Sequence, residues 1–423
     1  MPTAGRLLLL LPTRTYRTKD FLEAARGLGV EIVVGSEEKS TLEGHRPENL
    51  MTLDFRDPPA SVRRVLEFHR DRPVDAVVSV DEPTALVAAA VADALSLRHH
   101  PVESAAAAMN KRRMREVLHD AGIAVPSFAT YSVDDDPASI APHTHYPCVL
   151  KPVALSASRG VIRADRPEEL VSAFVRIRAI LESPDIPPDA EATRQIIIED
   201  YIPGFEVALE GLMDGSELRV LALFDKPDPL EGPFFEETIY VTPSRLPEVL
   251  QSEIAQVTGR AAAALGLRDG PIHAELRVDG EEVRPLEIAA RSIGGLCSRA
   301  LRFGAGTSLE EVIIRHALRM EIESLEREDR AAGVMMLPVP RAGNLVDVRG
   351  QDEALAVTGV DGIEITAHKG QALMPLPEGS RYLGFIFARA ETPEEVEAAL
   401  RESFGRLEIV MEDSPGTGIS RGM

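Results

Sequence analysis

The sequence predicts a mixed fold, in which an α/β portion at the start is followed by α+β portions. Three observations lead to this fold class: a repeated strand–helix pattern near the start, an alternating hairpin near residue 280, and short strands with one helix at the end. Strands that alternate with helices favour a parallel sheet, whereas consecutive strands favour an antiparallel one. At 423 residues, the chain is long enough for two or three domains.

The first hundred residues have the pattern of a small Rossmann-like layer. Apolar runs such as RLLLLL and VEIVVG flank an amphipathic segment, which makes a βαβ unit. The expected elements are strands at 6–11, 30–35 and 74–80 and helices at 18–28 and 83–97. Asp81 and Glu82 follow the last of these strands, at the carboxyl edge where such sheets bind ligands. No G-x-G-x-x-G follows the first strand, so a dinucleotide is not expected there.

The middle of the chain has a different pattern. We expect one helix at 104–120 that carries Lys111, then strands at 195–200 and 206–213, helices at 247–265 and 308–319, and a hairpin at 271–290. A charged stretch at 327–333 suggests a domain boundary. The last ninety residues predict strands at 334–339, 363–367 and 382–389. A final helix is expected to begin at Thr392, whose capping box with Glu395 and following Pro393 are typical of a helix start.

Composition excludes several classes of protein. The 68 acidic and 46 basic residues give a net charge of -22, which disfavours nucleic acid and anionic membranes as partners. Cys148 and Cys297 are the only cysteines, so a disulfide scaffold is excluded and a cytoplasmic location fits. The run Leu7–Leu11 is too short for a signal peptide, and no apolar stretch is long enough to span a bilayer.

The hairpin GPIHAELRVDGEEVRPLEIAAR, 270–291, is the most informative segment. A three-residue loop at 280–282 would place Leu276 opposite Leu286, Ala274 opposite Ile288 and Glu275 opposite Glu287. Two facing carboxylates cost up to about 1 kcal/mol of stability, unless a divalent cation lies between them. His273 and Arg291 share their face, which favours a site for phosphate or developing negative charge. The alternative is a solvent-facing sheet surface, where water screens the repulsion.

A second informative stretch is YPCVLKPVALSASRGVI, 146–162. Lys151 interrupts an apolar strand, although only six of the 46 basic residues are lysines. The small residues Ser156, Ala157, Ser158 and Gly160 follow it. Backbone N–H groups of such a loop can fold over an anion, which suits nucleotide phosphates. The alternative is an ordinary strand and turn with a lysine that reaches out to solvent.

Taken in order, Lys111, YPCVLKPVALSASRGVI, IIIEDYIPGFEVALEG and AELRVDGEEVRPLEIAAR resemble the ATP-grasp superfamily. The branch that the chain resembles most is the carboxylate-amine ligases of the L-amino-acid ligase type. The resemblance implies an ATP-grasp fold with a Rossmann-like domain at 1–103, an ATP-grasp domain at 104–332 and an α+β cap at 333–423.

The resemblance also implies site residues, with ATP and Mg²⁺, or Mn²⁺ in its place, as cofactors. Lys111 and Lys151 would hold the α- and β-phosphates, and the loop with Ser156, Ser158 and Gly160 would close over the β- and γ-phosphates. The adenine would meet Glu199 and the backbone of Tyr201 and Ile202, the ribose would meet Glu206, and the metal would bind Glu275 and Glu287. Arg291 would steady the acyl phosphate, and His273 is a further catalytic candidate.

The reaction implied is formation of an acyl phosphate from a small-molecule carboxylate and its attack by an amine, with no nucleic acid or membrane involved. A homodimer is expected from the resemblance only. Two alternatives stay open: a carboxylase or purine-pathway ligase of the same superfamily, and a non-catalytic nucleotide-binding module.

The sequence departs from the family pattern at Ala289, where many members have an asparagine, and this leaves the number of metal ions open. Gly294 and Gly295 predict a roomy substrate site, which would be refuted if bulky amino acids were inert where small ones react. The segment 226–246, with Phe234 and Phe235, is either a substrate loop or a surface hairpin.

Overall fold

The structure, a computed structural model, describes residues 4–186 and 191–413, which form two compact units. The first unit contains residues 4–125, 206–224 and 244–329. The second contains residues 126–186, 191–205, 225–243 and 330–413. Among these residues there is no helix with the length and apolar character needed to cross a membrane.

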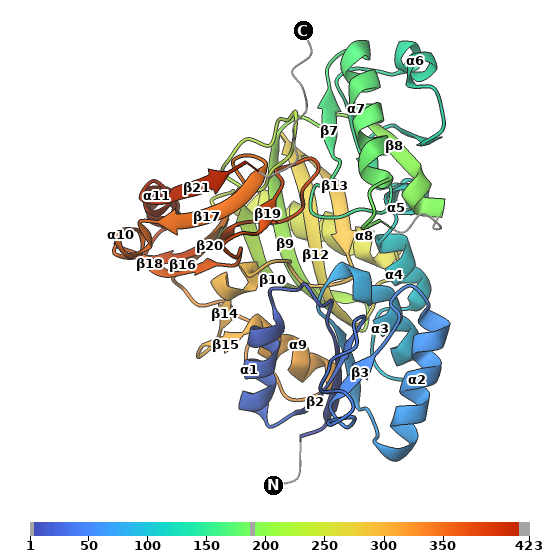
Figure 1. Ribbon diagram of the computed structural model, residues 1–423, viewed down its shortest axis with the longest axis vertical. Coiled ribbons are helices and arrows are strands. Elements are labelled where there is room, and N and C mark those ends of the chain that lie inside the picture. The colour runs from blue at the N-terminus through green and yellow to red at the C-terminus, as the bar shows by residue number, and fades with distance from the viewer. Residues whose placement is uncertain (1–3, 187–190, 414–423) are drawn as a thin grey trace. The chain divides into compact units, whose positions relative to one another are not determined.

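The first unit begins with a parallel four-stranded sheet in the order β3-β2-β1-β4. Figure 1 shows helix α1 on one side of these strands and helices α2 and α3 on the other. Leu7, Leu8, Leu9 and Leu10 are fully buried in β1, so the leucine run is a core strand as predicted. The elements are β1 (Arg6–Leu10), α1 (Thr18–Leu28), β2 (Glu31–Ser36), β3 (Leu50–Thr52), α2 (Pro58–Asp71), β4 (Ala76–Ser79) and α3 (Glu82–Ala94).

The rest of the first unit is built on strands in the order β13-β12-β9-β10. Helix α8 packs against them over a core that includes Val207, Leu209, Ile272, Ala274 and Ile288. The elements are α4 (Val102–Ala108), α5 (Lys111–Asp120), β9 (Phe205–Asp214), β10 (Glu217–Asp225), α8 (Glu248–Ala264), β12 (Gly270–Asp279), β13 (Glu282–Ala289), β14 (Arg302–Phe303), β15 (Thr307–Ser308) and α9 (Leu309–Ala317).

The single helix predicted at 104–120 is two helices, α4 and α5. The break lies at Asn110, whose side chain accepts a hydrogen bond from the Arg113 backbone N–H at 3.0 Å. Asparagine at this position caps a new helix, because its side chain competes with the backbone for the hydrogen bonds of a first turn. Lys111 is therefore the first residue of α5 rather than a mid-helix residue.

The second unit contains an antiparallel sheet in the order β5-β8-β6-β7, with α7 against it. Its core holds Leu150, Phe174, Ile177, Ile196 and Ile198. The elements here are β5 (Phe128–Ser132), α6 (Pro137–Ile140), β6 (Cys148–Pro152), β7 (Ile162–Ala164), α7 (Pro167–Leu181) and β8 (Gln195–Asp200).

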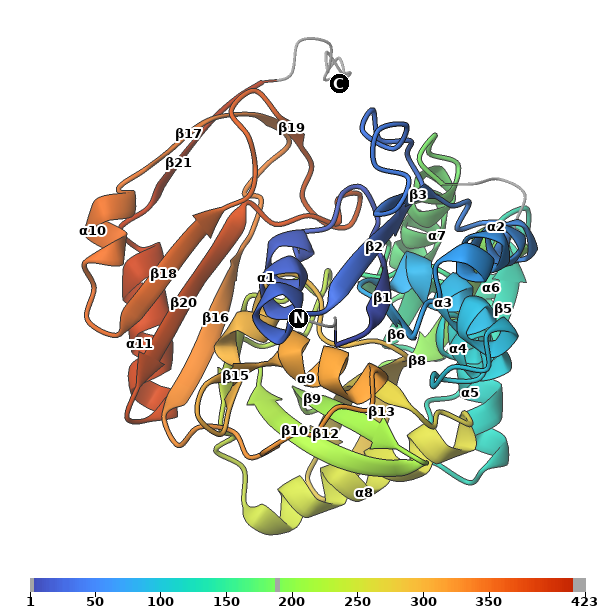
Figure 2. The same cartoon turned by 90° about the horizontal axis from the view of Figure 1, so that it is seen from below.

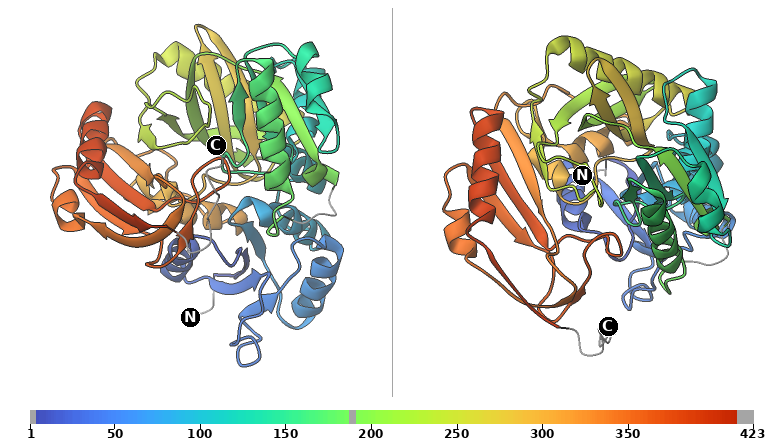
Figure 3. Two further views of the ribbon diagram at one scale, coloured as in Figure 1. Left: turned by 45° about the horizontal axis from the view of Figure 1, so that its top comes forward. Right: turned by 90° about the horizontal axis from the view of Figure 1, so that it is seen from above.

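The C-terminal part of the second unit is the expected α+β cap, and Figure 2 shows its strands β16, β20 and β18 beside helix α11. The same helix, drawn in red, lies along one face of these strands in both views of Figure 3. The capping box of Thr392 and Glu395 forms as predicted. The elements are β11 (Ile239–Thr242), β16 (Ala331–Leu337), β17 (Gly343–Arg349), α10 (Gln351–Leu355), β18 (Val360–Ile365), β19 (Ala372–Leu373), β20 (Gly384–Ala390), α11 (Pro393–Phe404) and β21 (Glu408–Glu412).

Candidate active site

Strands β12 and β13 carry the predicted pair of carboxylates in the first unit. Ala274 lies opposite Ile288, and Glu275 lies opposite Glu287, as the alternation predicted. The apolar residues of this register are fully buried, which fixes the strands relative to each other. The two carboxylates therefore share one face of the hairpin.

The predicted register is wrong nearer the turn. A bulge follows the carboxylate pair, so that Leu276 faces Pro285 instead of Leu286, and the loop holds two residues instead of three. Pro285 has no N–H to give to the ladder, and bulges are positions where a sheet tolerates proline. Because the slip lies on the turn side of the pair, it leaves the facing carboxylates in place.

His273 stands between two acidic side chains. Its Nδ1 is 3.1 Å from Glu210 Oε2, and its Nε2 is 3.7 Å from Glu275 Oε1. Burial by itself lowers a histidine pKa, but the contacts with Glu210 and Glu275 raise the pKa of His273 to about 9. The imidazole is therefore charged at neutral pH and holds Glu275 by charge, which favours a positioning role over proton transfer.

Glu287 lies within the field of several charged groups. Burial raises its pKa, the Lys111 cation opposes that rise, and the nearby carboxylates of Glu82 and Glu275 add to it. Arg291 donates to Glu82 Oε2 at 3.1 Å, and Glu82 is the first residue of α3. The structure thus brings Lys111, Glu275, Glu287 and Arg291 into one electrostatic cluster, together with the strand-end acid Glu82.

Arg291 is held as a cation. Burial lowers the pKa of this guanidinium, but Glu82, Glu287 and Asp81 together raise it above its ordinary value. A fixed, charged guanidinium beside carboxylates can pair with phosphate or with an oxyanion. The predicted ribose ligand Glu206 is buried in the same unit and lies 3.5 Å from Arg277 Nε through its Oε2.

Glu210 and Arg17 are among the buried charged residues that the sequence analysis did not predict. Glu210 accepts hydrogen bonds from the Ile293 N–H at 3.2 and 3.0 Å and is fully buried. Its position inside an apolar strand is the same signal that singled out Lys151, so it could have been found. Arg17, also fully buried, donates to Ser292 Oγ and to Ile293 O. Nothing in its local sequence indicates those partners, because they lie more than 270 positions away.

In the second unit, Lys151 and Glu199 form a buried ion pair. Lys151 Nζ is 2.6 Å from Glu199 Oε2, and the side chains are 12% and 2% exposed. Glu199 lies opposite Val149 in the antiparallel β6–β8 ladder, so it is the diagonal neighbour of Lys151 on the same face. The lysine in this apolar strand is therefore already paired with a carboxylate. A phosphate that bound Lys151 would interact with it alongside Glu199.

The small-residue loop after β6 has an unusual backbone. Ala157, Ser158 and Gly160 have φ angles of 56°, 54° and 75°, in the left-handed region. A Cβ at Gly160 would lie 2.7 Å from Pro152 Cγ, so glycine is required at this position. The Gly160 N–H donates to Pro377 O at 2.9 Å, which occupies one of the amide groups that the sequence analysis expected to face a phosphate.

The predicted adenine residues lie at the end of β8. The Tyr201 N–H donates to Pro147 O at 3.0 Å, and Arg163 stacks over the Tyr201 ring at 4.1 Å from its centroid. Ile202 is buried. Because the Tyr201 N–H already donates to Pro147 O, a nucleotide would contact Tyr201 through other atoms.

The segment 226–246 packs against its own unit. Phe234 pairs with Ile162 and lies under Arg176, whose guanidinium is 4.9 Å from the ring centroid. Lys226 is buried and forms an ion pair with Glu237. These contacts make the segment more than a solvated surface hairpin.

The hairpin carboxylates suit a divalent cation. They lie directly opposite each other, which places two negative charges side by side, and burial, with smaller contributions from Glu82 and Glu275, raises the pKa of Glu287. A Mg²⁺ ion prefers carboxylate oxygens combined with phosphate and water, and it would neutralise that charge. The donor set present therefore fits the predicted metal.

Comparisons with known proteins agree with this picture. Residues 22–99 match the family model of the ATP-grasp N-terminal domain, residues 144–300 match the ATP-grasp domain, and residues 335–412 match the L-amino acid ligase C-terminal domain 2.

Individual relatives point the same way. An alanine–anticapsin ligase of Bacillus subtilis is 27% identical over 52% of this chain and 49% of its own length. Dapdiamide A synthase of Enterobacter agglomerans is 25% identical over 80% of each chain. An L-amino acid ligase structure from Bacillus licheniformis superposes with a TM-score of 0.79 at 27% identity, over 97% of this chain and 99% of that one. The chain spans about half the length of the alanine–anticapsin ligases it matches.

Proposed function

Since the chain belongs to the ATP-grasp superfamily, we propose that it is an ATP-dependent ligase that joins a carboxylate to an amine through an acyl phosphate. The observation that carries this proposal is the facing pair Glu275 and Glu287 within reach of the Lys111 and Arg291 charges. The names of the relatives, an alanine–anticapsin ligase and an L-amino acid ligase, favour amino acids as substrates.

We assign the nucleotide-binding roles in each unit separately. In the second unit, Lys151 binds a nucleotide phosphate, Glu199, Tyr201 and Ile202 meet adenine, and the loop with Ser156, Ser158 and Gly160 covers the terminal phosphates. In the first unit, Lys111 binds phosphate and Glu206 binds the ribose hydroxyls. Both Lys151 and Glu199 are pre-positioned by the β6–β8 ladder, which lowers the entropic cost of binding.

Mg²⁺ bound at Glu275 and Glu287 would polarise the phosphates of ATP and neutralise their charge. His273 holds Glu275 in place through its charge, and Glu210 holds His273. Arg291 donates hydrogen bonds to Glu82 and to the Ser292 carbonyl. These bonds hold the guanidinium in one orientation, so it need not rearrange when negative charge develops on the substrate.

The reaction proceeds in two transfers. A carboxylate oxygen of the first substrate attacks the γ-phosphorus of ATP, and the bond from that phosphorus to the bridging oxygen of ADP breaks. The amine nitrogen of the second substrate then attacks the carbonyl carbon of the acyl phosphate, loses a proton, and inorganic phosphate leaves. Arg291 stabilises the negative charge of the acyl phosphate and of the tetrahedral intermediate.

The test is ADP release with Mg²⁺ and ATP against a panel of amino acids, singly and in pairs, with mass spectrometry of the products. We expect release that requires two amino acids and yields their dipeptide. If bicarbonate or a ribonucleotide alone stimulated release, a carboxylase or purine-pathway reaction would replace this one. ATP binding with no turnover on any acid would point to a non-catalytic nucleotide-binding module.

The domain organisation of this ligase is a Rossmann-like domain at 1–103, an ATP-grasp domain at 104–332 and a cap at 333–423. It works as a homodimer in the cytoplasm. Cys148 and Cys297 are both buried, which suits a reducing compartment. Light scattering after size exclusion would give twice the 45.9 kDa of one chain, and a monomer mass would overturn the dimer.

A further inference from the structure

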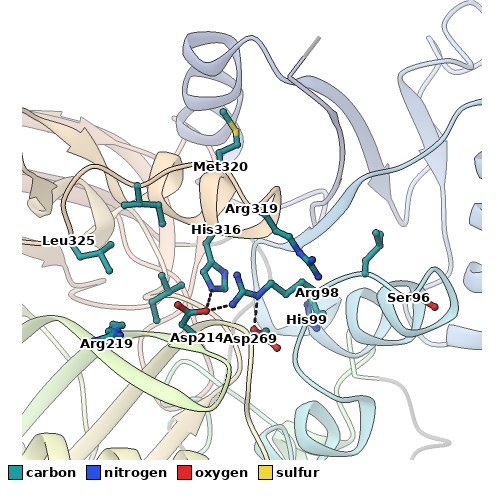
Figure 4. A pocket seen from close by; sticks show the side chains of 13 residues that line it. Ser96, Arg98, His99, Asp214, Arg219, Asp269, His316, Arg319, Met320 and Leu325 are labelled. Carbon is teal, nitrogen blue, oxygen red and sulfur yellow. Dashed lines mark hydrogen bonds and ion pairs between the residues drawn. The ribbon is translucent and has the colours of Figure 1, made fainter. Parts of the chain in front are cut away.

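A hollow of about 780 Å³ lies in the first unit, at the opposite end of β12 from the hairpin turn (Figure 4). Its polar groups come from four elements: Arg98 follows α3, Asp214 ends β9, Asp269 precedes β12 and His316 lies in the last turn of α9. The carboxyl ends of α3 and α9 both face this region, and helix carboxyl ends attract cations. No step of the proposed ligase reaction uses these residues.

His316 is buried, and its Nε2 atom lacks a hydrogen bond within the part of the chain that the structure describes. Its side chain is 6% exposed, its Nε2 has no hydrogen-bond partner, and Asp214 Oδ1 lies 3.9 Å away, beyond bonding distance. Figure 4 shows the ring directed at Asp214. A buried polar atom without a partner costs about 1–3 kcal/mol, and a ligand bound to Nε2 would relieve that cost.

The three candidate ligand atoms are already close. One oxygen from each of Asp214 and Asp269 and one ring nitrogen of His316 lie within 4.8 Å of one another. Metal–ligand bonds of about 2.1 Å need separations of roughly 3.4 Å in a tetrahedral site, so small side-chain rotations suffice.

Arg98 now fills the position of a cation. Its guanidinium pairs with Asp214 and, through Nε at 2.6 Å, with Asp269 Oδ1. Asp214 is 49% exposed, so this arginine can leave toward solvent. Two carboxylates and one arginine carry a net charge of -1, whereas two carboxylates and a divalent ion are neutral. Exchange of Arg98 for the ion is therefore favourable for the local charge.

We propose that Asp214, Asp269 and His316 form a second metal site, selective for a Zn²⁺-like divalent cation that displaces Arg98. One nitrogen and two carboxylate oxygens are a donor set that zinc accepts and that Mg²⁺ does not favour. The site is separate from the hairpin carboxylates, because Asp269 and Glu275 are six residues apart, about 20 Å along an extended strand. An ion bound here ties the end of α9 to β9 and β12.

The test uses the full-length, untagged and chelator-treated protein carrying Glu287→Gln, so that the hairpin site contributes little. It is titrated with Co²⁺, followed by visible absorption, and with Zn²⁺, followed by calorimetry and thermal unfolding. We expect one equivalent to bind, with the d–d bands of a four- or five-coordinate Co²⁺ and a higher Tm. Arg98→Gln should tighten binding at least ten-fold, because it removes the competing cation.

His316→Gln and, independently, Asp214→Asn should weaken binding at least ten-fold, whereas the exposed His143→Gln is the matched control and should bind like the parent. Circular dichroism reports whether each variant is folded, and two separate ligand variants protect the test from one that fails to fold. The proposal is overturned if Arg98→Gln binds no Co²⁺ or Zn²⁺, or if binding is unchanged in both His316→Gln and Asp214→Asn.

Discussion

The first unit contains a buried cluster of charges around Arg17 and a partly buried one around the hairpin, and the two differ in how their charges are balanced. Around Arg17, Nη2 meets the Glu310 carboxylate at 3.0 Å and Nη1 binds Ser292 Oγ, Ile293 O and Val80 O, whereas Nε has no hydrogen-bond partner among the described residues. Around the hairpin, the carboxylates of Glu82, Glu210, Glu275 and Glu287 outnumber the cations of Lys111, His273 and Arg291.

The difference separates two uses of buried charge. The charges of Arg17 and Glu310 neutralise each other and link the start of α1 to α9, so this pair stabilises the fold. An excess of negative charge at the hairpin destabilises the protein alone and is relieved by a cation. Net charge within a buried cluster therefore distinguishes a ligand site from a structural pair.

Of the variants that test this difference between the two clusters, Glu287→Gln should have the largest effect. ADP release should fall at least about 100-fold, the scale for losing one electrostatic stabiliser of a transition state. Thermal unfolding should be unchanged or slightly later, since a like-charge pair is removed. Glu282→Gln, on the exposed end of the same hairpin, is the control and should keep full turnover. Turnover of Glu287→Gln within two-fold of the parent would contradict the metal-site assignment.

Arg17→Ala should test the other cluster. It leaves Glu310 buried without its partner, so the free energy of unfolding should fall by about 3–5 kcal/mol in urea titrations. The double variant Arg17→Met with Glu310→Leu should regain most of that loss, because both charges are gone. Lys19 forms an exposed ion pair with Glu23, so Lys19→Ala is the neighbouring control and should leave the free energy of unfolding almost unchanged. Equal stability of Arg17→Ala and the parent would show that the pair is not structural.

The Arg17 pair also predicts a pH dependence. Burial is the largest single influence and raises the pKa of Glu310, but the Arg17 charge and the hydrogen bonds from Ser298 and Arg17 together outweigh it, so the folded pKa lies below the ordinary 4.5. The unfolded chain therefore binds the proton more tightly, and this contribution to stability is present above about pH 4.5 and lost as the pH falls below it. Urea midpoints between pH 3 and 6 should show a smaller loss for Glu310→Gln than for the parent. The same loss in both would refute the assignment, and Glu23→Gln serves as the exposed control.

The smallest expected effect is a change in the preferred size of the amino-acid substrate when Gly294 is enlarged. A Cβ at Gly294 meets no atom within 4 Å, which supports the roomy site predicted from the sequence. Gly294→Val should lower kcat/KM for bulky amino acids about ten-fold relative to alanine, the scale of adding methylene-sized groups to a pocket. Gly44→Val, at an equally open surface glycine, should leave the ratio unchanged. An unchanged ratio in Gly294→Val would place the substrate elsewhere.

The sequence could predict what depends on local spacing. The opposition of Glu275 and Glu287 follows from a period of two within one hairpin, and the Thr392 capping box follows from a spacing of three. The bulge beside Pro285 was missed, because a proline that breaks the ladder can be accommodated on either side of the pair. The break at Asn110 was missed because the helical pattern continues through it.

Other elements could not be predicted from local sequence patterns, because they depend on residues that are distant in the sequence. Strand β10 begins with exposed residues, among them the apolar Val220, and short strands such as β3 and β19 depend on their neighbours. The pairing of Arg17 with Glu310 joins residues 293 positions apart, so only the tertiary fold defines it. The balance of charge in each cluster is visible only once such distant partners are known.

The most direct test of the central claim is binding of Mn²⁺, used as a paramagnetic substitute for Mg²⁺, in the presence of ADP, measured by electron paramagnetic resonance. The parent should bind Mn²⁺ together with the nucleotide, whereas Glu275→Gln with Glu287→Gln should bind ADP but lose the bound Mn²⁺ signal. Unchanged Mn²⁺ binding in the double variant would show that the facing carboxylates are not the metal site.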